Sequence, residues 1–123
     1  MNLTNPVLID IVNERGRQAM KGFDAQHDDN HPEGELARAA ACYAWPHVVS
    51  HTDSFGRPLD ANGRPRPMTD AELKHSWSYV PALRWPWSGA SWKLKDTRSN
   101  LVRAAALIVA EIERIDRKER SKS

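Results

Sequence analysis

Cysteine is almost absent from this 123-residue sequence, in which Cys42 stands alone. A single cysteine cannot form a disulfide within the chain, and among alanines it is expected to act as a small buried hydrophobe. The longest apolar run, AAALIVA at residues 104–110, is far shorter than the roughly 20 residues of a membrane span. The N-terminal MNLTNPVLID has no basic flank, and Asp10 interrupts its apolar run, so no signal peptide is expected. We therefore expect a cytoplasmic protein with no membrane partner.

The sequence also lacks a large excess of one charge. The 18 Lys and Arg residues are offset by 16 Asp and Glu residues, which leaves a net charge of +2. Such a balance makes nucleic acid an unexpected partner. Part of the basic excess lies in residues 118–123, a short tail expected to be frayed. The length accommodates one core, so a single domain over residues 1–123 is expected.

Both ends of the chain show the periodicity of amphipathic helices. One helix is expected from an N-cap at Asn5 to a stop at Gly22. Another is expected from a cap at Asp96 or Thr97 to about Arg117. The first carries an apolar stripe of Leu8, Ile11, Val12 and Ala19, and the last carries Leu101, Ala105, Ile108, Ile112 and Ile115, at spacings of four, three, four and three.

A third long helix is expected between them, from about Glu33 to Tyr43. Leu36, Ala40 and Tyr43 share one face of it, and the alanines allow a neighbouring helix to approach closely. The Trp45-Pro46 pair is expected to end this helix, because a residue before proline is disfavoured in the α region.

The rest of the middle is expected to be loop, with one short helix. Residues 46–68 are rich in Gly, Pro, Asp and Asn and predict a loop insertion with a hairpin-like turn from Asp60 to Gly63. A capping box at residues 69–72 predicts a short helix that runs to about Trp77. The tryptophan-rich residues 78–93 predict an ordered loop. The predicted fold class is all-α, with three main helices and one short helix, and a core that a homodimer can complete.

The first candidate site is the segment HDDNH at residues 27–31. His27, Asp28 and His31 are candidate catalytic groups, and Asp29 is a candidate metal ligand. Imidazole with carboxylate suits a transition metal such as Mn²⁺, whereas carboxylates alone suit Mg²⁺. A spacing of four brings two histidines together only on a helix, and residues 22–32 show no clear helical pattern. The alternative, which these residues favour, is a polar entry to the next helix.

The last helix contributes a pair of carboxylates. Glu113 and Asp116 are three residues apart and share a face, a spacing that lets two carboxylates hold one divalent ion. The alternative is a solvated stripe in which these acids alternate with Arg114 and Arg117.

A third candidate site combines aromatic and basic side chains. Trp85, Trp87 and Trp92 lie close to two cations, Arg84 and Lys93. Aromatic faces can stack on a nucleobase while the cations hold its phosphates. The alternative is that the tryptophans form the lid of a small core, and both can hold because a lid can also be the wall of a pocket.

The blocks IVNERGRQAMKGFDAQHDDNHPEGELARAAACYA, RWPW, WK and RSNLVRAAALIVAEIERIDR together resemble a family of small phage and prophage proteins. The resemblance covers both ends of the chain but not residues 46–80. More distantly, ERGRQ, HDDNH and GELARAA resemble the start of the MazG-like all-α NTP pyrophosphohydrolases. That resemblance implies an E-x-x-E pair and an E-x-x-D pair that hold magnesium at a nucleoside triphosphate. Glu113 and Asp116 match the second pair, whereas Glu35 is followed by Arg38 where the first pair has its other acid.

These resemblances predict a phage-type nucleotide-binding protein in the host cytoplasm. Glu35, Asp29, Glu113 and Asp116 would hold Mg²⁺ or Mn²⁺ for hydrolysis of a phosphoanhydride. One alternative is a non-catalytic counter-defence protein that sequesters a host nucleotide signal. Another is an inhibitor that binds a host defence protein through exposed tryptophans, which concentrate binding energy at interfaces.

Overall fold

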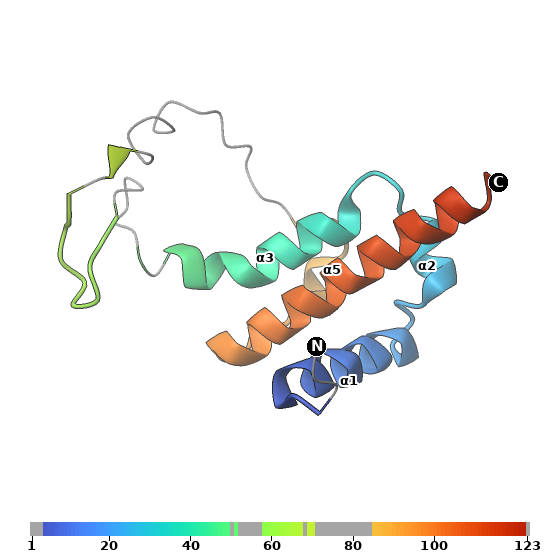
Figure 1. Ribbon diagram of the computed structural model, residues 1–123, viewed down its shortest axis with the longest axis horizontal. Coiled ribbons are helices and arrows are strands. Elements are labelled where there is room, and N and C mark those ends of the chain that lie inside the picture. The colour runs from blue at the N-terminus through green and yellow to red at the C-terminus, as the bar shows by residue number, and fades with distance from the viewer. Residues whose placement is uncertain (1–3, 50, 52–57, 68, 71–84, 123) are drawn as a thin grey trace.

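The structure is a computed structural model that describes residues 4–49, 51, 58–67, 69–70 and 85–122. Within these ranges the regular elements are helices, together with one antiparallel bridge between Leu59 and Pro65, and the all-α prediction is confirmed. The helices, seen in Figure 1, are α1 (Pro6–Met20), α2 (Ala25–Asp29), α3 (Glu35–Val49), the 3₁₀ turn η1 (Gly89–Ser91) and α5 (Thr97–Arg120).

The long helix α5 is the centre of the packing. It runs beside α3 and α1, and α2 lies against it as well (Figure 1). The core is built largely from small side chains, which let α3 and α5 approach closely. Its buried members are Leu36, Ala39, Ala40 and Tyr43 from α3 and Ala104, Leu107 and Ala110 from α5.

Helix α1 begins where its sequence predicts. The side chain of Asn5 accepts a hydrogen bond from the Val7 amide at 2.8 Å, and Pro6 occupies the first turn. Gly22 follows the helix with a φ of +104°, a conformation that favours glycine at a helix end. The predicted apolar stripe is only partly covered, because Val12 is 69% exposed.

Two predictions about the middle of the chain are wrong. Helix α3 continues through Pro46 to Val49, so neither its predicted end nor the predicted start of the loop insertion at residue 46 holds. Pro46 has no backbone N–H, so α3 lacks the i→i−4 hydrogen bond to the carbonyl of Cys42 and nevertheless continues for three residues. Residues 22–32 do contain a helix, α2, whose first turn is capped by Asp24 through a hydrogen bond from the His27 amide at 3.0 Å.

The predicted turn from Asp60 to Gly63 is confirmed. The Gly63 amide donates to the Asp60 carbonyl at 3.0 Å, and Gly63 has a φ of +76°. The predicted short helix up to Trp77 lies, beyond Asp70, outside the described residues.

Helix α5 differs from its prediction in length and in the face that it buries. Asp96 caps it by accepting from the Ser99 amide, and the helix ends at Arg120, so the tail predicted to fray from residue 118 is helical for three more residues. The buried face carries Ala104, Leu107 and Ala110. The predicted stripe is the exposed face instead: Leu101, Ile108, Ile112 and Ile115 are 40–53% exposed.

None of the helices that the structure describes is long and apolar enough to span a lipid bilayer.

Candidate functional site

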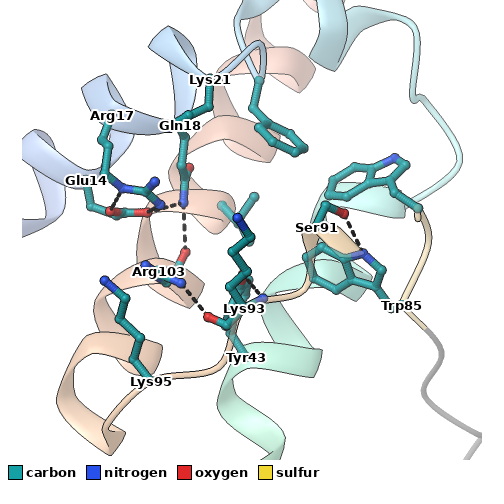
Figure 2. Close-up of a pocket in the computed structure, with 13 residues that line it drawn as sticks. Glu14, Arg17, Gln18, Lys21, Tyr43, Trp85, Ser91, Lys93, Lys95 and Arg103 are labelled. Atoms are coloured by element: carbon teal, nitrogen blue, oxygen red, sulfur yellow. Dashed lines mark hydrogen bonds and ion pairs between the residues drawn. The ribbon is translucent and has the colours of Figure 1, made fainter. Parts of the chain in front are cut away.

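A cavity of about 370 Å³ lies between α1, α5 and the segment from Trp85 to Lys95 (Figure 2). Helix α3 contributes Tyr43 to its lining. The volume falls within the roughly 300–1,000 Å³ of most small-molecule sites.

Five cationic side chains line this cavity: Arg17, Lys21, Lys93, Lys95 and Arg103. Within the described structure, no hydrogen bond or ion pair engages the ammonium groups of the three lysines. Figure 2 shows Lys93 pointing into the space between Gln18 and Ser91. Because these charges are unpaired, the cavity carries a positive potential that favours an anionic ligand.

The carboxylate in this lining, Glu14, is already paired. Arg17 donates to both of its oxygens, at 2.6 and 2.7 Å, and Gln18 donates to one of them at 3.0 Å. Burial raises the pKa of Glu14, but hydrogen bonds and charge from Arg17, with help from Gln18 and Arg103, outweigh it and leave this pKa below its usual range. Glu14 is therefore ionised at neutral pH and fixes Arg17 in place.

Two buried polar atoms at the cavity have no partner among the described residues, the Oε1 of Gln18 and the Nε1 of Trp87. The amide nitrogen of Gln18 donates to the Glu14 carboxylate and to the Arg103 carbonyl. Because both neighbours are acceptors, the orientation of the amide is fixed and its oxygen is the free end. Unpartnered buried polar groups are rare, and both of these atoms have almost no accessible surface, so they lie beneath the surface of the cavity.

The aromatic side of the cavity is held rigidly. The Trp85 ring stacks on Trp92 with centroids 6.1 Å apart and meets Tyr43 edge-on at 5.4 Å. Its Nε1 donates to the Ser88 carbonyl and to the Ser91 hydroxyl, both at 3.0 Å. A fixed indole can stack on a planar ring without first losing side-chain entropy.

Tyr43 and Arg103 tie the Trp85–Lys95 segment to the helices. The Tyr43 hydroxyl accepts from the Lys93 amide at 3.2 Å, and the Arg103 guanidinium donates to the Lys93 carbonyl. Arg103 also lies 5.7 Å from the centroid of the Tyr43 ring. These contacts place the lysines of the segment at the cavity.

The predicted catalytic residues lie behind the aromatic wall. The rings of His27 and His31 are 4.3 Å apart, and each contacts Trp87, at 5.3 and 5.6 Å. Asp28 is fully buried and accepts hydrogen bonds from Arg15 at 2.6 Å and from Nδ1 of His27 at 3.0 Å. The observed contacts of Asp28 join α1 to α2, and a catalytic role for these three residues stays a prediction.

Asp28, predicted as catalytic, and Glu113, predicted as a metal ligand, both contact one arginine. Arg15 contacts Asp28 through Nη2 and Glu113 through Nε, the latter at 3.5 Å. The guanidinium therefore provides there the positive charge that a metal ion would provide.

The other predicted ligands have different surroundings. Asp29 accepts three hydrogen bonds from Arg117, at 2.8, 3.1 and 3.4 Å, and Glu35 accepts one from the backbone amide of Glu33 at 2.6 Å. Asp116 is exposed on α5. Across the described residues, His, Cys, Asp and Glu side chains form no group of three or more that is placed to hold a metal.

Some of the residues predicted to bind a nucleotide line the cavity. Trp85, Trp87 and Lys93 line it, Trp92 supports Trp85 from behind, and Arg84 lies outside the described residues. The contribution of α1 was missed, although Glu14, Arg17, Gln18 and Lys21 recur at helical spacing and form one polar stripe.

No protein-family model matches the chain, and comparison with curated proteins and with solved structures found no significant similarity. The resemblance to phage proteins and to MazG-like enzymes therefore stays a prediction.

Proposed function

We propose that this protein binds a nucleotide, or a nucleotide-derived signal, in the cavity between α1 and Trp85 and releases it unchanged. The observation that carries the proposal is the set of three unpaired lysine ammonium groups beside a fixed aromatic wall. The lysines suit phosphate groups, and Trp85 or Trp87 suits a base.

Binding without hydrolysis is supported by the pairing of the acids. Asp28 and Glu113 contact Arg15, and Asp29 contacts Arg117. A metal ion at these carboxylates would have to displace a charge-assisted hydrogen bond at each one. The resemblance to phage proteins favours a host signalling nucleotide as the ligand.

The test is a thermal-shift screen of nucleoside monophosphates, triphosphates and cyclic dinucleotides, with Mg²⁺ and with EDTA. We expect at least one nucleotide to stabilise the protein in EDTA, by about 2.7 kcal/mol at 100 times its dissociation constant. Chromatography of the ligand recovered after heat denaturation should show it intact. Magnesium-dependent cleavage that is lost in Asp116→Ala would instead favour the pyrophosphohydrolase prediction.

Charge reversal locates the site. Lys93→Glu should weaken binding about tenfold or more, because it reverses a charge at the cavity. Lys118→Glu is the matched control, since it makes the same charge change on the exposed end of α5 and should leave the dissociation constant unchanged. Equal effects of both variants would contradict binding in this cavity.

A further inference from the structure

The exposed face of α5 carries a line of large apolar side chains. Leu101, Ile108, Ile112 and Ile115 are 40%, 50%, 53% and 43% exposed, and Ala105 is partly covered between them. Leu101 is two residues from Arg103, about 200° round the helix, so this stripe lies opposite the cavity. No element crosses in front of α5 in the view of Figure 1.

The spacing of the stripe is that of a helix–helix seam. Steps of four, three, four and three residues are the steps of the core positions in a heptad repeat, and they keep one apolar line facing a partner helix. A helix that packs inside its own domain usually shows a wider stripe. Here the buried alanines of α5 occupy one side, and the seam is a second apolar side.

We propose that a second copy of this chain covers this face, with the two α5 helices antiparallel about a twofold axis near Ile108. The proposal is independent of the nucleotide. It rests on the seam and on the charges at its two ends.

The charges at the two ends of the seam favour a second copy of the chain as the partner and an antiparallel arrangement of the two α5 helices. The same spacing places Arg98 three residues before the seam and Glu119 four residues after it. They are 60% and 64% exposed, and each also has an exposed ion pair within its own chain, Arg98 with Asp10 and Glu119 with Lys122. In an antiparallel pair, Arg98 lies opposite Glu119 of the second copy. In a parallel pair each faces its own equivalent, and two like-charge contacts result.

Two further apolar side chains, outside the seam itself, are exposed. A stable dimer buries about 800 Å² on each partner, which one short seam does not supply. Val109 beside the seam is 37% exposed. Val12 of α1, 69% exposed, is two residues from the cavity-facing Glu14 and so on the other side of its helix.

The test is the molar mass of the full chain in solution, measured by sedimentation equilibrium over a range of micromolar concentrations. Wild type should weigh twice 13.9 kDa. The double variant Ile108→Glu/Ile112→Glu should dissociate at least about 100-fold more readily and keep its helical circular dichroism, because both side chains are half exposed in the monomer. A monomeric wild type, or a dimeric variant, would overturn the proposal.

A control and a second measurement fix the geometry. Met20→Glu changes a side chain that is 91% exposed and off the seam, and it should leave the dimer intact. In a Cys42→Ala background, Ile108→Cys should form a disulfide-linked dimer under mild oxidation. Leu101→Cys should not, because antiparallel packing holds the two copies of residue 101 about 22 Å apart. Equal crosslinking of both would overturn the antiparallel arrangement.

Discussion

At the scale of single residues, two neighbouring aspartates of α2 have opposite environments. Asp28 is fully buried between Arg15 and His27, whereas Asp29 is half exposed and contacts Arg117 at the surface. Their different burial could not be predicted from the sequence, because both belong to the same polar segment, HDDNH. What separates them is the direction of each side chain from a helix that the sequence pattern did not reveal.

These environments predict very different costs of removing the charge. Asp28→Asn should lower the free energy of unfolding by about 3 kcal/mol, because it leaves the mostly buried Arg15 with only the longer contact to the exposed Glu113, at 3.5 Å. Asp29→Asn should cost less than about 1 kcal/mol, as for other solvent-exposed ion pairs. Urea denaturation of both variants measures the difference. Similar costs for the two would contradict a structural role for Asp28.

Gln18 lines the candidate site but was not predicted from the sequence to do so. In the sequence it belongs to the charged side of an amphipathic helix, where solvent exposure is the usual outcome. In the structure it is 6% exposed, because Arg103 and the Trp85–Lys95 segment close over that side of α1. The aromatic residues of the same cavity were predicted, since their composition alone suggests stacking.

At the scale of elements, the N-caps and the stop of α1 at Gly22 were predicted correctly, whereas the ends of α3 and α5 were not. Asn5 and Asp96 start their helices as expected, since a cap depends on residues two or three positions away. The ends depend on packing. Helix α3 continues beyond its predicted stop while its Tyr43 and Ala44 pack against the core, and that packing outweighs the local effect of Pro46.

Pro46 therefore offers a prediction about α3. Proline in a helix interior costs about 3 kcal/mol relative to alanine, and its restriction of the unfolded chain returns up to about 1 kcal/mol. Because Pro46 stands near the helix end, we expect Pro46→Ala to raise the free energy of unfolding by a smaller amount, about 1 kcal/mol. Chemical denaturation with circular dichroism measures it, and a destabilised variant would show that α3 ends before Pro46.

At the scale of the whole molecule, α5 has two distinct sides. One side joins α1 and the tryptophan segment around the cavity, and the other carries the seam proposed for a second copy. The sequence predicted the stripe of Leu101, Ile108, Ile112 and Ile115 as the apolar side of α5. The alanine side, which is the buried one, was missed although it fits helical periodicity equally well. The alanine side of α5 forms the contact within the chain, because its small residues allow α3 to approach closely.

This arrangement places the cations of the cavity at its open rim, which makes their contribution to binding sensitive to salt. Lys21, Lys93 and Lys95 are exposed, so their attraction for a phosphate is screened as the Debye length falls from about 10 Å at 0.1 M salt to about 3 Å at 1 M. We expect the affinity for the tightest-binding nucleotide of the screen to fall on the order of tenfold over that range. The affinity for the corresponding nucleoside, which has no phosphate and binds through stacking and hydrogen bonds, should change little. Calorimetric titrations of both ligands at the two salt concentrations separate the two contributions. A nucleotide affinity that does not depend on salt would mean that the phosphates lie away from the lysines, and that the aromatic wall alone supplies the binding energy.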